Sequence, residues 1–229
     1  MDVINEWNLA ARSYSESDSK SPYSIFCKKF VSNHFSNIQN FKILDAGCGN
    51  GDYTHILTKK EGNVIGCDGS EEMLKIAKLR YPSYQFDHVN LLKNIPYKNE
   101  EFDIVFCNLV LMDIDPIDIL INEIYRIIKN DGLFFFSIVH PAFYLADWEK
   151  DEKGVVISKK VKKYITPYIE KQVFWGITTH YHRPISYYYN KLSESGFTFK
   201  NMFEPGIYEG RKIPDIPLYL FTEFIKKER

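Results

Sequence analysis

The sequence contains no paired cysteines and no long apolar segment. Its four cysteines, Cys27, Cys48, Cys67 and Cys107, lack the short spacings of a zinc site or a disulfide framework. We interpret them as small buried apolar side chains in a reducing compartment, and we expect no bound metal. No segment approaches the ~18 apolar residues of a membrane-spanning helix, and no signal-peptide pattern opens the sequence. We therefore expect a cytoplasmic protein without a membrane partner.

An excess of either charge is also missing. Lys and Arg number 29 and Asp and Glu number 30, and the resulting net charge of −1 argues against nucleic acid as a partner. With 229 residues, 45% of them hydrophobic, the chain fits one α/β domain, and we find no internal repeat. We expect a single domain over residues 1–229, and the sequence leaves the oligomeric state open.

The segment 41–51 departs from this ordinary composition. Ile43 and Leu44 suit a strand buried on both faces, which ends at Asp45 and is followed by glycines at positions 47, 49 and 51. Glycines allow positive φ and let a ligand approach the main chain closely. A helix is expected from Tyr53, and the amides of its first turn would point back over this turn. The pattern predicts a turn that binds a nucleotide-sized ligand.

The spacing of these glycines does not match a dinucleotide-binding turn. That fingerprint places a third glycine at position 52, where this sequence has Asp52. Asp45 at the strand end would repel a pyrophosphate and would suit an ammonium or sulfonium charge. Asp68, which lies 21 residues after Gly47 (68 − 47), ends a second apolar run, where a carboxylate can accept both ribose hydroxyls. Together these residues indicate S-adenosyl-L-methionine as the cofactor and S-adenosyl-L-homocysteine as the product.

Four motifs follow one another in the first half of the chain, at residues 45–51, 66–70, 106–113 and 131–137. In this order they resemble the motifs of the Rossmann-like (class I) S-adenosylmethionine-dependent methyltransferases, and in particular of their small-molecule branch. The resemblance is close over about residues 41 to 140 and loose outside them. It implies an enzyme that transfers a methyl group to an oxygen or nitrogen of a small-molecule acceptor.

Apolar strands alternate with amphipathic helices until a final pair of strands. This order predicts an α/β fold, a three-layer sandwich around a mostly parallel seven-stranded sheet with an antiparallel strand near its end. Residues 1–40 are expected to form an N-terminal helical cap, interrupted by a serine-rich flexible hinge at residues 13–22. Residues 142–183 are expected to form an inserted lid, in which 155–165 and 171–178 pair as a hairpin.

Further cofactor contacts follow from the resemblance. Tyr14 would contact the methionine end of the cofactor from the N-terminal helix, or would only pack in the core. Met73 would border the adenine, and Asn90 stands where the family often has an acid, so its amide oxygen would accept from the adenine amino group. Asn108 is expected at the carboxyl end of a strand, facing the ligand crevice. The predicted cofactor-binding residues are Tyr14, Asp45, Gly47, Gly49, Gly51, Asp68, Gly69, Met73, Asn90, Leu91 and Asn108.

His140 is the predicted general base. It follows a strand end where the transferred methyl group should lie, and an imidazole with a pKa of ~6.5 can take a proton near neutrality. The alternative is that this histidine only holds the turn before Pro141. A base is needed only if the acceptor is not already nucleophilic, since methyl transfer is an in-line displacement in which positioning supplies much of the catalysis.

The acceptor pocket is expected between the sheet edge and the lid, where the aromatic residues concentrate. His180 and His182 would share one face of an extended segment, but without a third ligand they make a poor metal site. Arg183 would hold an anionic group of the acceptor, and the lid lysines would form a solvated face or attract such a group. The predicted acceptor-binding residues are Tyr144, Trp148, Trp175, His180, His182 and Arg183.

Two other functions remain open from the sequence. A nicotinamide-dependent oxidoreductase would share the first strand and turn, but it requires the glycine that Asp52 replaces. A non-catalytic S-adenosylmethionine-binding or regulatory protein would keep the cofactor turn and lack an organised acceptor pocket. Cofactor binding separates the first alternative from the methyltransferase, and product release separates the second.

Overall fold

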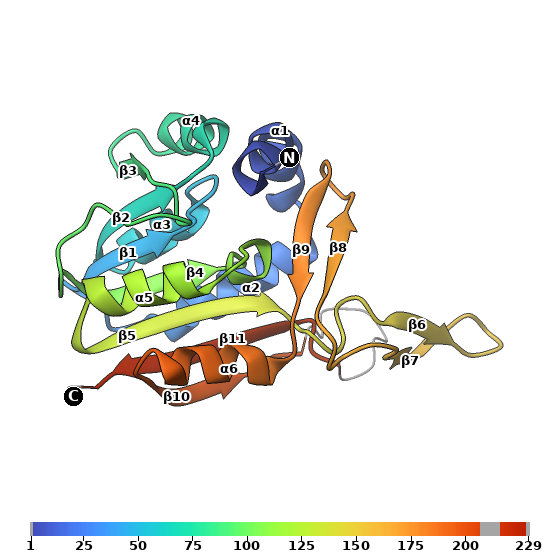
Figure 1. Ribbon diagram of the computed structural model, residues 1–229. Helices are drawn as coiled ribbons and strands as arrows, with labels where there is room; N and C mark the ends of the chain where they lie inside the picture. The colour runs from blue at the N-terminus through green and yellow to red at the C-terminus, as the bar shows by residue number, and fades with distance from the viewer. Residues whose placement is uncertain (1, 207–215, 228–229) are drawn as a thin grey trace.

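A seven-stranded sheet forms the centre of the computed structural model, which describes residues 2–206 and 216–227 (Figure 1). Its strand order is β10-β11-β5-β4-β1-β2-β3. Within the described sheet β11 alone runs opposite to the other six strands, and it lies between β5 and β10. The predicted sheet, mostly parallel with an antiparallel strand near its end, is confirmed. The strands are β1 (Lys42–Ala46), β2 (Asn63–Asp68), β3 (Gln85–His88), β4 (Phe102–Asn108), β5 (Ile128–Val139), β10 (Phe197–Phe203) and β11 (Tyr219–Lys226).

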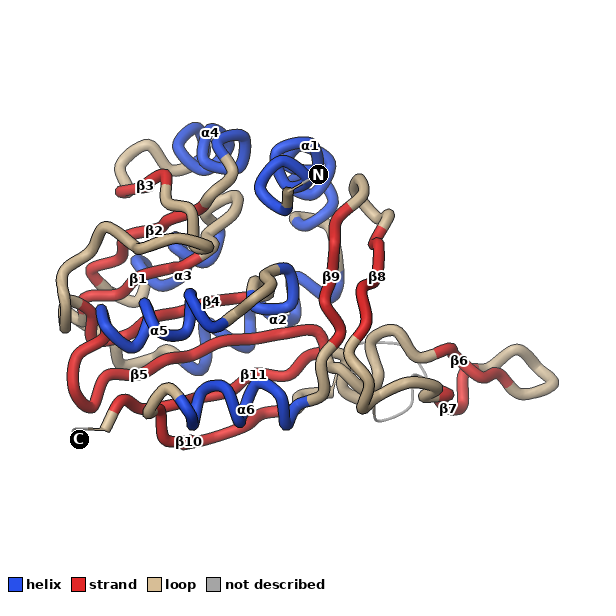
Figure 2. The backbone as a smooth tube through the Cα atoms, in the orientation of Figure 1, coloured by secondary structure: helices blue, strands red, loops and turns tan. Residues whose placement is uncertain are grey.

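Helices cover both faces of this sheet and make the predicted three layers (Figure 2). Successive residues of a strand point to opposite faces. Leu44 of β1 therefore packs in the core beneath α5 and α6, and Ile43 packs in the core beneath α2 and α3. The helices are α1 (Val3–Asp18), α2 (Pro22–His34), α3 (Asp52–Lys59), α4 (Glu71–Arg80), α5 (Asp118–Ile127), α6 (Ile185–Glu194) and the short 3₁₀ helix η1 (Leu111–Asp113). None of the described helices is long and apolar enough to cross a membrane.

The N-terminal helix is longer than the sequence suggested. α1 continues to Asp18, so the flexible hinge predicted at residues 13–22 is wrong. Ser15 is buried on this helix, and Ser21 instead caps α2 by accepting a hydrogen bond from the Ser24 amide. The serines therefore serve as helix and cap residues rather than as a linker, which composition alone does not distinguish.

The lid region forms two separate hairpins. β6 (Asp147–Lys150) pairs with β7 (Val156–Lys160), and β8 (Tyr168–Gln172) pairs with β9 (Thr178–His182). The predicted pairing of 155–165 with 171–178 is therefore wrong, because each strand pairs with its nearer neighbour in the chain. In Figure 1 both hairpins project beyond the end of the sheet where β5 finishes, and β9 lies beside α1.

Candidate functional site

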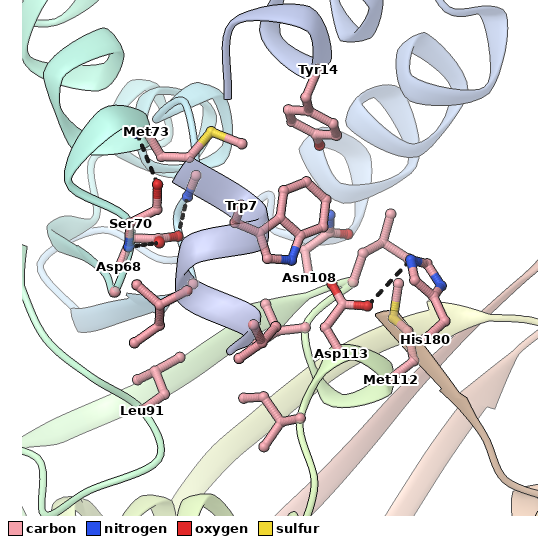
Figure 3. A pocket seen from close by; sticks show the side chains of 18 of the residues that line it. Trp7, Tyr14, Asp68, Ser70, Met73, Leu91, Asn108, Met112, Asp113 and His180 are labelled. Carbon is pink, nitrogen blue, oxygen red and sulfur yellow. Dashed lines mark hydrogen bonds and ion pairs between the residues drawn. The ribbon is translucent and has the colours of Figure 1, made fainter. Parts of the chain in front are cut away.

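A cavity of about 160 Å³ lies at the carboxyl ends of β1, β2 and β4, below α1 and β9 (Figure 3). Open α/β sheets bind ligands at this edge. The structure brings most of the predicted site residues together here. Those that line the cavity are Tyr14, Gly47, Gly49, Asp68, Gly69, Met73, Asn90, Leu91, Asn108, Tyr144, Trp175 and His180.

The glycine-rich turn after β1 forms one wall. The amides of Gly47 and Cys48 donate to the Cys67 carbonyl at 2.8 and 2.9 Å, which fixes the turn against β2. Gly49 has φ 52°, and a Cβ built on it would meet no atom within 4 Å, so its backbone faces open space. Gly51 does not line the cavity. It precedes α3 with φ 83°, and a Cβ there would lie 2.8 Å from the Phe86 ring, so packing requires this glycine.

Asp68 is held at the cavity wall by two backbone amides. Its Oδ2 accepts from the Gly49 amide at 2.9 Å and its Oδ1 accepts from the Ser70 amide at 2.7 Å. Burial raises the pKa of Asp68, and these hydrogen bonds act against that rise. Each carboxylate oxygen keeps a further acceptor position. The side chain is therefore oriented to accept ligand hydroxyls from the cavity.

Asp45 lies outside the cavity wall. Its carboxylate is 1% exposed and accepts a hydrogen bond from Thr54 Oγ1 at 2.6 Å, toward α3. Burial raises the pKa of this carboxyl to about 7. The structure thus assigns Asp45 to holding β1 against α3, and it does not face a ligand as the sequence suggested.

The amide oxygens of the two predicted asparagines are already engaged. Asn90 Oδ1 accepts from the Leu92 amide at 2.9 Å, and Asn108 Oδ1 accepts from Ser137 Oγ at 2.7 Å. The Asn90 oxygen keeps one further acceptor position, so the expectation that it accepts from an adenine amino group stays a prediction. Both residues still line the cavity.

Three aromatic rings from two distant segments, α1 and the β8–β9 turn, close the cavity. Trp7 of α1 stacks on Trp175 of the β8–β9 turn at 6.4 Å between ring centres. Tyr14 meets the edges of both rings, at 5.4 Å from Trp7 and 5.1 Å from Trp175. Trp7 was not predicted as a site residue, although its helical spacing from Tyr14 places both on one face. The helical spacing of Trp7 and Tyr14 was therefore a signal by which the sequence could have indicated Trp7 beside Tyr14.

Asp113 and His180 face each other at the far end of the cavity (Figure 3). Asp113 Oδ1 and His180 Nε2 lie 3.3 Å apart, and the Trp7 side chain hydrogen-bonds to the same carboxyl group. Burial raises the pKa of Asp113 well above its ordinary value and lowers the pKa of His180 to about 4. Both shifts favour the uncharged forms. The sequence analysis predicted His180 as a site residue. It did not predict Asp113, although Asp113 belongs to the third motif, at residues 106–113.

Unpaired polar atoms mark this end of the cavity. Asp113 Oδ1, His180 Nε2 and Trp175 Nε1 are buried without a hydrogen-bond partner among the described residues, because the 3.3 Å contact is poorly oriented. Buried polar groups are nearly always paired in native proteins, and exceptions require an explanation. Asp113 Oδ1 and His180 Nε2, 3.3 Å apart, are positioned to bind one polar group of a ligand.

His140 does not reach this cavity, contrary to the prediction. Its Nε2 pairs with Glu204 Oε1 at 2.7 Å, its Nδ1 accepts from the Ala142 amide at 3.2 Å, and its ring stacks on Phe143. The pocket beside it measures about 20 Å³, which holds about one water molecule. The geometry therefore supports the alternative that His140 holds the turn after β5.

Three predicted acceptor-binding residues also lie outside the cavity. His182 Nε2 contacts the Tyr164 carbonyl at 2.8 Å. Arg183 is 3% exposed and donates to the carbonyls of Leu111 and Ile114 and to the Asp115 carboxylate, so it braces the segment that carries Asp113 and is not available to an anion. Trp148 lies on β6 under the Lys159 ammonium group, away from the cavity. Sequence position could not reveal these partners.

The described residues contain no group of three or more His, Cys, Asp or Glu side chains that could hold a metal ion.

Comparisons with known proteins agree with this arrangement. A family described as "Methyltransferase domain" matches residues 44–136. The demethylmenaquinone methyltransferase of Lactobacillus johnsonii is 36% identical over 97 residues, which cover 39% of this chain and 40% of that protein. The chain thus spans less than half the length of this curated relative.

Solved structures match over more of the chain. A Listeria monocytogenes protein assigned as an S-adenosylmethionine-dependent methyltransferase has a TM-score of 0.72 and 26% identity, over 84% of this chain and 93% of that one. An S-adenosylmethionine-dependent methyltransferase from Mesorhizobium loti has a TM-score of 0.76 and 20% identity, over 91% and 99%. At that lower identity the second likeness shows the fold alone.

Proposed function

Because the chain belongs to the Rossmann-like S-adenosylmethionine-dependent methyltransferases, we propose that it transfers a methyl group to an oxygen or nitrogen of a small molecule. S-adenosylmethionine is the cofactor of that family, so the cofactor expected from the sequence is confirmed. The residues that hold the cofactor and the acceptor are part of our proposal.

The cavity walls fit this cofactor. Asp68 offers acceptor positions suited to two ribose hydroxyls, and Gly49 leaves its backbone open on the same side. Met73 and Leu91 supply apolar walls for an adenine ring. When bound, S-adenosylmethionine supplies an electrophilic methyl group carried by a sulfonium.

The acceptor end is assigned to Asp113 and His180, and not to His140. The observation that carries this assignment is the presence of unpaired, buried polar atoms on both side chains, 3.3 Å apart at the cavity wall. An acceptor hydroxyl or amine bound there would be oriented by both groups. As its oxygen or nitrogen gains the methyl group, its proton passes to the imidazole of His180, which burial holds in the uncharged form that can accept it, and the Asp113 carboxyl group 3.3 Å away orients that imidazole.

The acceptor is proposed to be largely apolar with one reactive polar group. Trp7, Trp175 and Tyr14 enclose the cavity, and Met112, Val139 and Tyr219 add further apolar surface. A hydroquinone has this character. One relative acts, by its name, on demethylmenaquinone, which is a quinone. Aromatic rings suit an aromatic acceptor because they stack with it over a large area.

Two measurements test the proposed function. Calorimetric titration should show binding of S-adenosylmethionine and of S-adenosylhomocysteine, and no binding of NAD. Incubation with S-adenosylmethionine and a panel of phenols, hydroquinones, amines and carboxylates should release S-adenosylhomocysteine with at least one acceptor class. Binding of NAD in place of S-adenosylmethionine would identify the oxidoreductase alternative. Cofactor binding without turnover on every acceptor would favour the non-catalytic alternative.

A further inference from the structure

The two hairpins carry most of the exposed apolar side chains of the described chain. Of the 17 large hydrophobic side chains that are exposed, ten lie within residues 142–183. The most exposed of these are Ile165 at 79% and Val173 at 72%, followed by Phe174 at 64%, Ile177 at 63% and Ile169 at 62%. Apolar exposure concentrated in one segment of the chain is a sign of an interaction surface, since scattered single residues are the norm elsewhere.

The fold itself does not require these side chains to be apolar. The same hairpin also contributes to the cavity, because His180 of β9 lines it, and the preceding Thr178 and Thr179 are buried. Phe174 and Ile177 flank Trp175, whose ring packs against α1, yet they point into solvent. The β8–β9 hairpin thus contributes His180 and Trp175 to the cavity, while Ile169, Phe174 and Ile177 of the same hairpin are exposed without a covering element among the described residues.

Positive charge accompanies this apolar surface. Residues 142–183 contain seven Lys and one Arg against five Asp and Glu, a balance of +3, so the rest of the chain carries −4 (−1 − 3). Four of the lysines fall within residues 159–163. Lys160 and Lys163 are exposed and make no ion pair within the described residues, although Lys163 lies over the Tyr168 ring. The charge of the hairpins is therefore opposite to that of the remaining chain.

We propose that this hairpin surface, which comprises Lys160, Lys163, Ile165, Ile169, Phe174 and Ile177, docks on an anionic lipid bilayer. Apolar side chains beside lysines are the composition of segments that lie in the membrane interface: the apolar groups enter the head-group boundary and the lysines pair with anionic lipids. Such docking needs no membrane-spanning helix. The positive balance favours an anionic bilayer over a second copy of the hairpins, which would carry the same positive balance and repel the first.

The docking surface and the cavity share one hairpin. Trp175 and His180 line the cavity from the β8–β9 turn and from β9, and the same turn exposes Phe174 and Ile177. Docking would place the cavity cover at the bilayer surface, where an apolar acceptor dissolved in lipid could enter. This consequence rests on the proposed methyl transfer, whereas the docking itself does not.

Vesicle binding tests the proposal with the full-length protein. The protein should sediment with vesicles of phosphatidylcholine and phosphatidylglycerol, and high salt or pure phosphatidylcholine should release it. Replacing Lys160 and Lys163 by Gln should weaken binding at least about tenfold, since each lysine near an anionic surface contributes about a fivefold factor. Phe174→Ser combined with Ile177→Ser should weaken it by about tenfold or more.

A matched control lies on α4. Lys78 and Leu79 are exposed outside the hairpins, so Lys78→Gln combined with Leu79→Ser should leave vesicle binding within about twofold. S-adenosylmethionine affinity should stay near wild type in every variant, which shows intact folding and keeps this test separate from the proposed function. Absence of vesicle binding at low salt, or equal losses in the α4 variant, would overturn the proposal. The proposal would also be overturned if the protein formed a dimer in vesicle-free buffer and Phe174→Ser dissociated that dimer without weakening vesicle binding.

Discussion

Glu6 of α1 accepts hydrogen bonds from the amide and the hydroxyl of Thr179 in β9, at 2.7 and 2.9 Å, across 173 residues of chain. The same carboxylate, which is 3% exposed, pairs with Lys171 of β8 at 2.7 Å. One buried side chain thus joins the N-terminal helix to the second hairpin. Because Trp7 and Trp175 lie on these two elements, Glu6 holds the cavity cover together.

Acid should loosen this connection. Burial alone would raise the pKa of Glu6, but the hydrogen bonds from Lys171 and Thr179 outweigh it and the pKa falls below its ordinary 4.5. The stabilisation is therefore complete above pH 4.5 and is lost as the pH falls below it through the folded-state pKa. Tryptophan fluorescence should report the change in this range, and Glu6→Gln should give the loosened spectrum already at neutral pH.

Glu16→Gln provides the control for that experiment. Glu16 lies on the same helix and pairs with Arg12, but both side chains are largely exposed. Exposed pairs contribute little to stability. The pH response of this variant should match the wild type, and an equal response of the two variants would remove Glu6 from the explanation.

Asp68→Ala should weaken S-adenosylmethionine binding at least about tenfold, because a hydrogen bond to a charged group contributes roughly 1.5–3 kcal/mol. Calorimetry measures this directly. Asp87→Ala serves as the control, since Asp87 lies on the neighbouring strand β3 and pairs with the Tyr97 hydroxyl outside the cavity. Unchanged affinity of the Asp68 variant would show that the ribose assignment is wrong.

The acceptor assignment predicts a split between turnover and binding. Asp113→Asn and His180→Gln should each lower turnover by about 10²–10⁴ once an acceptor is known, with S-adenosylmethionine affinity nearly intact. His140→Ala should chiefly lower stability, because it breaks the contact with Glu204 and leaves the cavity wall unchanged. A large loss of turnover in the His140 variant, with Asp113→Asn near normal, would restore the base predicted from the sequence.

Gly51→Ala should destabilise the fold more than Gly154→Ala does. Both glycines have positive φ, 83° and 77°, so both variants incur the cost of about 1–2 kcal/mol for a left-handed residue with a side chain. Only at Gly51 would the new methyl group also meet the Phe86 ring, at 2.8 Å. Urea unfolding should therefore show a larger loss for Gly51→Ala, and equal losses would mean that packing at this turn is looser than described.

The cofactor half of the site was predictable because its residues are close in sequence. The turn at Gly47 and Gly49 and the carboxylate of Asp68 follow buried strands, and strand ends of a parallel sheet share one edge. The spacing of such local motifs is visible without the structure. The predicted sheet followed from the same alternation of apolar strands and amphipathic helices.

The acceptor half depends on contacts between distant segments. The proposed role of Asp113 depends on its contacts with His180 and Trp7. These three residues come from three separate elements. His140 lost its predicted role because a partner in the segment after β10, Glu204, occupies its ring nitrogen. The strand pairing of the two hairpins was predicted wrongly for a similar reason. Composition indicates strands but does not specify which strands pair.

The position of β11 has a consequence for synthesis of the protein on the ribosome. β10 joins the sheet only through β11, which pairs with β5 on its other side. Since β11 is made after β10, the nascent β10 has no neighbouring strand to pair with until residues 219–226 have emerged. The glycine-rich turn after β1, which is synthesised much earlier, would until then belong to an incomplete sheet in which the β5 edge is unpaired. During translation that edge is where a chaperone would be expected to bind.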